Sequence, residues 1–167
     1  MKKAGFIALI VLATAGCNKP SRVEQYKAEK RVQDSVRLEE QIRSMAYYEG
    51  RLEEMMPTAD SLMALFTYER NEKYQDHGYY VVKPSAVGWA YSGLRVMVRD
   101  DGRDLLVYQD GKRLTNERVN ELGNGGNKAI ALAEELQVTI SDIKELEKRI
   151  GRTSLEIQKY QKRLQKQ

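Results

Sequence analysis

The chain has a single histidine, His77, and it directly follows Asp76. An aspartate beside a histidine is the pair used in general acid–base catalysis, because the carboxylate orients the imidazole that moves the proton. That chemistry also needs a nucleophile or a second relay group. The sequence has no nucleophile motif, no second histidine, and no cysteine apart from Cys17. We therefore expect His77 to be structural and the protein not to be an enzyme.

Two other short motifs could suggest chemistry. Asp100 and Asp101 are paired carboxylates, but Asp101 precedes Gly102, and Asp-Gly is typical of a tight hairpin turn. The glycine-rich stretch "GNGG", residues 123–126, lacks the Lys-Ser/Thr of a phosphate loop, so we interpret it as a flexible joint. With one cysteine and one histidine, the chain also lacks the ligand set of a protein-only zinc site. We expect no metal and no cofactor.

Aromatic side chains gather in the middle of the chain and are the densest unusual feature. They are Tyr74, Tyr79, Tyr80, Trp89, Tyr91 and Tyr108. These rings could form the core of a small sheet, or, bordered by Lys83, Arg95 and Arg99, they could stack on a sugar or anchor a protein partner. Because a small sheet cannot bury six rings, we expect some to be exposed. The residues predicted to bind a partner or ligand are Tyr79, Tyr80, Trp89, Tyr91 and Arg95.

The N-terminus has the pattern of a secretory signal. Lys2 and Lys3 precede an apolar run over residues 4–13, which is too short to span a bilayer. The run ends in "LATAGC", and this ending resembles the lipobox of bacterial lipoproteins, with Thr14 where the family prefers leucine. The resemblance covers the first 17 residues only. The alternative is an ordinary secretory signal that happens to end near a cysteine.

The lipobox resemblance implies that residues 1–16 are a signal peptide and that Cys17 becomes the lipidated first residue. Two or three acyl chains anchor a protein stably. By the family's sorting rule, Asn18 after the cysteine favours the outer membrane, facing the periplasm. Removal of Lys2 and Lys3 lowers the formal net charge from +4 to +2. With no nucleic-acid motif, we expect no nucleic-acid partner.

Residues 17–21 form a short tether, and Ser21 with Glu24 fits a capping box that starts a helix at Arg22. Apolar residues then recur at alternating spacings of four and three, with Glu49 filling one place. The positions are Leu38, Ile42, Met45, Leu52, Met56, Ala59, Met63 and Phe66. This spacing predicts a first coiled-coil arm over residues 22–75, helical to about residue 71. Because the spacing continues through Pro57, we expect a kinked helix there, with two separate helices as the alternative.

A second heptad pattern predicts a C-terminal coiled-coil arm over residues 127–167. Its positions are Leu132, Leu136, Thr139, Ile143, Leu146, Ile150, Thr153, Ile157, Tyr160 and Leu164. Between the arms, residues 76–126 have strand character at residues 78–84, 94–99 and 104–109. We expect a small antiparallel sheet of three or four strands, and a short helix over residues 115–122.

These elements predict an α+β fold, mostly α, in which a long antiparallel coiled-coil hairpin carries a small antiparallel sheet at its tip. The competing arrangement is a coiled coil between copies of the chain. In the hairpin, four basic residues near the C-terminus lie beside the anchoring membrane. They are Lys159, Lys162, Arg163 and Lys166. The plainer interpretation is a solvated helix end whose cations suit the helix dipole.

The sequence therefore predicts a membrane-anchored, non-enzymatic scaffold of the cell envelope, in which a stalk presents a β tip to a protein partner. The alternative is a module that binds peptidoglycan or another glycan through exposed aromatics of the tip.

Overall fold

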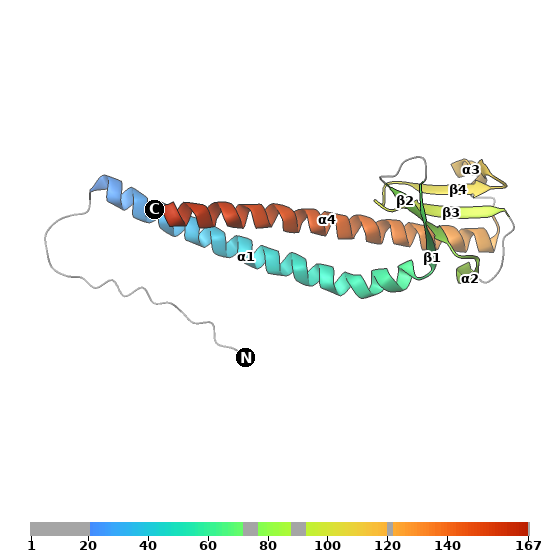
Figure 1. Ribbon diagram of the computed structural model, residues 1–167, viewed down its shortest axis with the longest axis horizontal. Helices are drawn as coiled ribbons and strands as arrows, with labels where there is room; N and C mark the ends of the chain where they lie inside the picture. Colours follow the sequence, from blue (N-terminus) through green and yellow to red (C-terminus); the bar gives the residue numbers. More distant parts are fainter. Residues whose placement is uncertain (1–20, 72–76, 88–92, 120–121, 167) are drawn as a thin grey trace.

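The computed structural model describes residues 21–71, 77–87, 93–119 and 122–166. Two long helices lie side by side, and an antiparallel sheet lies at one end of the pair (Figure 1). The elements in chain order are α1 (Arg22–Met63), β1 (Phe66–Arg70), β2 (Gly78–Val82), α2 (Pro84–Val87), β3 (Leu94–Arg99), β4 (Leu105–Gln109), β5 (Lys112–Arg113), α3 (Asn116–Val119) and α4 (Asn124–Lys166). The predicted composition, mostly helical with a small antiparallel sheet, is confirmed.

Helix α1 starts at the predicted capping box. The Glu24 backbone N–H donates to Ser21 Oγ at 3.3 Å, and the Ser21 N–H donates to Glu24 Oε2 at 2.7 Å. The helix continues through Pro57 without a break, as predicted, and Pro57 is exposed. The Pro57 carbonyl accepts a hydrogen bond from Ser61 Oγ at 2.8 Å.

The expected helix to residue 71 is too long, because α1 ends at Met63 and β1 follows. The segment from Phe66 to Tyr68 is aromatic and β-branched, which favours a strand, and it pairs with β2. Phe66 joins the core and is only 4% exposed. The first helical arm therefore ends, and the sheet begins, before the expected boundary at residue 75.

Helices α1 and α4 run in opposite directions, and two contacts give their register. Arg163 Nη1 lies 3.9 Å from Asp34 Oδ1, and the Arg149 guanidinium lies 5.8 Å from the centre of the Tyr48 ring. From Asp34 to Tyr48 α1 advances by fourteen residues, and from Arg149 to Arg163 α4 advances by the same number. The register is thus unchanged over two heptads.

Three of the heptad positions predicted in α1 are displaced by one residue. Ile42, Glu49 and Met56 are exposed, whereas their neighbours Gln41, Tyr48 and Met55 are half-buried. The other predicted positions in α1 are half-buried or buried: Leu38, Met45, Leu52, Ala59 and Met63. At the middle of the three displaced positions the Tyr48 ring packs against the Arg149 guanidinium, and the charged Glu49 next to it stays hydrated in solvent. In α4 the ten predicted positions are all half-buried or buried.

The sheet is a meander with strand order β1-β2-β3-β4-β5. The three predicted strands correspond to β2, β3 and β4, while β1 and β5 complete the sheet. Its inner face packs on the N-terminal half of α4, where Val96, Val98 and Val107 join Leu136 and Ile140 in the core. Figure 1 shows α4 running under the strands before it continues beside α1.

The predicted joint at residues 123–126 is wrong in part, because α4 already begins at Asn124 and Gly125 and Gly126 are buried. A Cβ on Gly126 would lie 2.7 Å from Leu122 Cβ. The glycine is therefore needed for close packing of the helix start against Leu122.

The turn between β3 and β4 docks on the middle of α4. Gly102 has a φ of +74°, and a Cβ there would lie 2.7 Å from Ser141 Oγ and 3.2 Å from the Gln137 carbonyl oxygen. The turn between β4 and β5 uses positive φ at both Asp110 and Gly111, as a tight hairpin requires.

Gly102→Ala tests the docking of this turn. The left-handed conformation costs an alanine about 1–2 kcal/mol, and the clash with α4 adds to that cost. Gly111→Ala is the matched control, because its φ is +76° and nothing lies within 4 Å of its Cβ position. In urea unfolding followed by circular dichroism, Gly102→Ala should lower the free energy of unfolding more than Gly111→Ala. Equal losses would contradict the docking.

Candidate interaction surface

Successive residues of a strand point to opposite sides of a sheet, so the observed pairing defines an outer sheet face away from α4. We use this name for ten residues: Thr67, Glu69, Tyr79, Val81, Arg95, Met97, Arg99, Leu106, Tyr108 and Arg113. The apolar core that joins the sheet to the described helices contains strand residues of the inner face only. In the described part of the chain, no helix covers the outer sheet face.

An apolar row crosses the centre of the outer sheet face. Val81 is paired with Met97, and Met97 is paired with Leu106, so the three side chains are direct neighbours on adjacent strands. Val81 is 9% exposed, and Met97 and Leu106 are half-buried. Tyr79 and Tyr108 lie on the two sides of this row and are also half-buried. The row with its two tyrosines is a surface that a partner could cover.

An ion pair between Arg95 and Glu69 spans this face from β3 to β1. Glu69 shares a row with Tyr79, and Arg95 shares a row with Tyr108, so the pair reaches across the apolar row between them. The two side chains are 51% and 48% exposed. Exposed ion pairs of this kind contribute about 0–1 kcal/mol to the stability of a folded protein. A partner could therefore open this pair at low cost in free energy.

Arg99 is held by the turn that follows its strand. Its guanidinium bonds to the Asp101 carboxylate, and Arg99 Nη1 lies 3.1 Å from Asp104 Oδ2. The Asp101 carboxylate also accepts a hydrogen bond from the Arg103 backbone N–H at 3.0 Å. Asp101 therefore belongs to the hairpin turn, as the Asp-Gly sequence predicted.

The predicted tip residues are divided between the two faces. Tyr79 and Arg95 share the outer sheet face, but Tyr80 points to the inner face, opposite Val98. The Tyr80 ring lies 5.2 Å from that of Tyr68 and packs against the core, so Tyr80 is excluded from the outer surface. Trp89 and Tyr91 lie outside the described residues, as does Tyr74.

Sequence reasoning missed Met97 and Leu106. A usable signal was present, because Met97 alternates with the valines Val96 and Val98 along one strand, and Leu106 precedes Val107 along the next. A strand that is apolar at consecutive positions carries apolar side chains on both faces of its sheet.

Asp100 joins neighbouring strands at the edge of the sheet beside His77. Asp100 Oδ2 accepts hydrogen bonds from the Gly78 backbone N–H at 2.7 Å and from Tyr68 Oη at 3.0 Å. His77 lies with its ring 5.9 Å from the ring of Tyr79, whereas Asp76 lies outside the described residues. Among the described residues, no three His, Cys, Asp or Glu side chains are grouped so that they could hold a metal ion.

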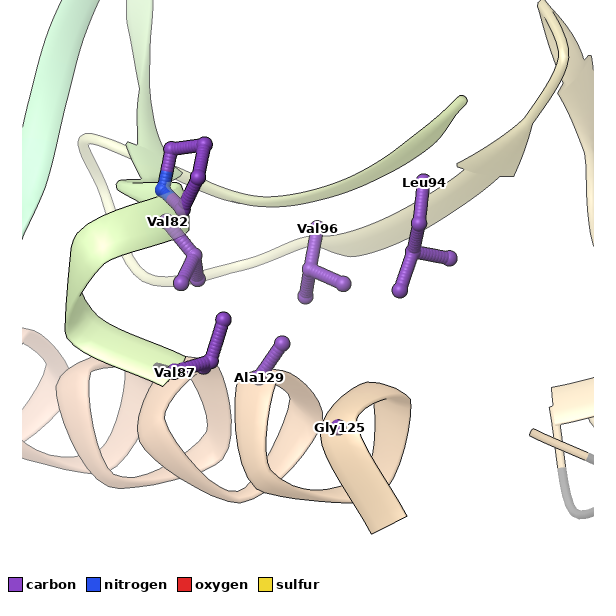
Figure 2. Close-up of a pocket in the computed structure, with 7 residues that line it drawn as sticks. Val82, Val87, Leu94, Val96, Gly125 and Ala129 are labelled. Carbon is purple, nitrogen blue, oxygen red and sulfur yellow. The ribbon is translucent and has the colours of Figure 1, made fainter. Parts of the chain in front are cut away.

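A small apolar cavity lies on the inner side of the sheet. Figure 2 shows Val87 from α2 and Ala129 from α4 below Val82, Val96 and Leu94 of the strands. Its volume is about 30 Å³. Ligand pockets usually measure about 300–1,000 Å³, so the space among the described residues is much smaller than a typical ligand pocket.

The four predicted basic residues lie on the last turns of α4 and are exposed. Lys159 Nζ bonds to Glu156 Oε1 at 3.3 Å. Arg163 faces Asp34 of α1, which is only 3% exposed, and lies 5.5 Å from the centre of the Tyr160 ring. Arg163 therefore also helps to join the two helices, while Lys162 and Lys166 point to solvent.

Asp100 raises the pKa of Tyr68, chiefly because its carboxylate accepts the hydrogen bond of the phenol. Because the pKa is raised in the folded chain, this bond contributes fully to the free energy of unfolding at neutral pH. The contribution is lost as pH rises through the raised pKa. In Asp100→Asn the pKa of Tyr68 should fall toward the ordinary value of about 10. Carbon-13 NMR titration of the tyrosine rings measures this. Asp104→Asn, in the same turn, is the control. An unchanged pKa in Asp100→Asn would contradict the assignment.

No protein-family model matches the chain, and the searches of curated proteins and of solved structures found no match either. In the described part of the chain, no helix has an apolar stretch long enough to cross a bilayer.

Proposed function

We propose that the protein is a cell-envelope lipoprotein, anchored through Cys17, that acts as a non-enzymatic scaffold. In this proposal α1 and α4 form a coiled-coil stalk, and the outer sheet face binds a protein partner. The observation that carries the proposal is the position of the outer sheet face, which no described helix covers and which lies at the opposite end of the hairpin from Arg22 (Figure 1).

The constant register between α1 and α4 supports the coiled-coil stalk. The contacts of Asp34 with Arg163 and of Tyr48 with Arg149 are two heptads apart on both helices. Leu38, the first apolar seam position in α1, is half-buried and lies between these contacts. A seam that keeps its register over whole heptads is typical of left-handed helix pairs.

The length of the helices supports a stalk that holds the tip away from a membrane. Helix α1 has 42 residues and α4 has 43. At 1.5 Å per residue, these lengths are about 63 and 65 Å. Cys17 precedes Arg22 by five residues, which span at most about 18 Å. A lipid on Cys17 therefore holds the start of α1 near the bilayer, and the sheet stands several tens of ångströms away.

The chemistry of the outer sheet face favours a protein partner. An apolar centre with tyrosine and arginine around it is the usual composition of a binding hot spot. Contact with Met97 and Leu106 removes apolar area from water, and Arg95 becomes available when its pair with Glu69 opens.

The partner can be tested with a photo-crosslinking amino acid at Thr67 or Tyr108, incorporated in cells. Both positions belong to the outer sheet face, and we expect one discrete heavier adduct from each. A crosslinker at Val138, which is 60% exposed on α4, is the control and should give no such adduct. Arg95→Glu should reduce the adduct about tenfold, as loss of one hot-spot side chain does.

Two results would contradict the protein partner. One is an adduct pattern that is the same at Val138 as on the outer sheet face. The other is saturable co-sedimentation of the protein with peptidoglycan that is lost when Tyr79 and Tyr108 are both changed to alanine. This second result would assign the two tyrosines to glycan stacking.

The anchor is tested by the mass of the mature chain. Protein extracted from the membrane should begin at Cys17 and carry the mass of a diacylglycerol group, usually with a further acyl chain. Cys17→Ser should abolish both the lipid and the cleavage before residue 17. A mature N-terminus at any other residue would contradict the lipoprotein assignment.

A further inference from the structure

Helix α1 extends past the end of α4. The contact between Asp34 and Arg163 gives the register, which places Lys166 of α4 beside Arg31 of α1. The preceding turns of α1, residues 22–30, therefore extend beyond Lys166, and of the described residues of α4 the Arg163 side chain lines a hollow with Tyr26 and Lys30. Figure 1 shows the first turns of α1 projecting beyond the C-terminal end.

The projecting turns carry apolar and basic side chains together. Val23 and Tyr26 are one turn apart, and each is 63% exposed. Arg22, Lys27 and Lys30 are exposed on the same turns. A short helical segment with this composition suits the boundary between water and a lipid surface, where tyrosine rings and cationic side chains gather.

The same end of the hairpin has a strong excess of positive charge. Residues 22–37 and 156–166 contain nine Lys and Arg side chains and four acids, which are Glu24, Glu29, Asp34 and Glu156. Two of these acids pair with cations of the same end, Asp34 with Arg163 and Glu156 with Lys159. The other two acids, Glu24 and Glu29, are outnumbered by the seven remaining basic residues.

We propose that this end of the hairpin binds the surface of an anionic lipid bilayer. We call the residues that make the contact the base patch: Arg22, Val23, Tyr26, Lys27, Lys30, Lys162 and Lys166. The cations bind lipid phosphates, and Val23 and Tyr26 enter the headgroup region. The inference rests on the proposed function, because a lipid on Cys17 keeps the base patch at the membrane.

The test uses the full lipidated chain in vesicles of phosphatidylethanolamine and phosphatidylglycerol with brominated acyl chains, which quench tryptophan fluorescence on contact. The probe is Tyr26→Trp in a Trp89→Phe background. Tyr47→Trp is the matched control, because Tyr47 is 64% exposed on the same helix. The two positions are separated by about 32 Å of helix. We expect strong quenching at residue 26 and little at residue 47.

The contribution of charge is tested with two double variants that change the net charge equally. Lys162→Glu with Lys166→Glu alters the base patch. Lys144→Glu with Lys148→Glu alters exposed positions near the middle of α4, away from the base patch. The first pair should reduce quenching at residue 26 several-fold at low salt, because each basic residue adds to binding at an anionic surface. The second pair should leave the quenching unchanged.

Equal quenching at residues 26 and 47, whether strong or absent, would overturn the base patch. So would a Tyr26→Asp variant that converts a dimer of the protein into a monomer, because the exposed residues would then join two copies of the chain. The mass of the mature chain separates the two proposals. If the chain is lipidated but residue 26 is not quenched, the proposed base patch is wrong and the proposed lipid anchor stands.

Discussion

The fold depends on the burial of one continuous stripe along α4. In its first half, Ala133, Leu136 and Ile140 are buried against the sheet and the end of α1. In its second half, half-buried positions continue beside α1 to the level of Asp34. Removal of this apolar surface from water is the main favourable term, and neither the sheet nor α1 could cover its own apolar side without α4. The sheet and the hairpin are therefore parts of a single folding unit.

Most of the fold could be predicted because the repeats are regular. The heptads of α4, the Asp-Gly turns and the three central strands each follow from local spacing. The displaced seam in α1 could not be predicted in the same way, since Tyr48 and Glu49 are adjacent and only packing against Arg149 distinguishes them. Strand β1 was missed because Phe66 continued the helical spacing, while its pairing with Val82 is a contact between distant segments.

The candidate surface was predicted in part, for a related reason. Tyr79 and Tyr80 are adjacent in a strand, so they must point to opposite faces, and composition does not indicate which one faces the helix. The pairing of β2 with β3 shows which tyrosine faces the helix, because it places Tyr80 beside the buried Val98. Met97 and Leu106 are not distinctive as isolated residues in the sequence. They became a surface only when cross-strand pairing made them neighbours.

The direct connection from α1 into β1 has a mechanical consequence. Only Ala64 and Leu65 separate the end of the helix from the strand, so a shift of α1 along its axis also moves the start of β1. Strand β1 is held to β2 over five residue pairs. A pull along β1 loads these hydrogen bonds together, in shear, rather than opening them one after another.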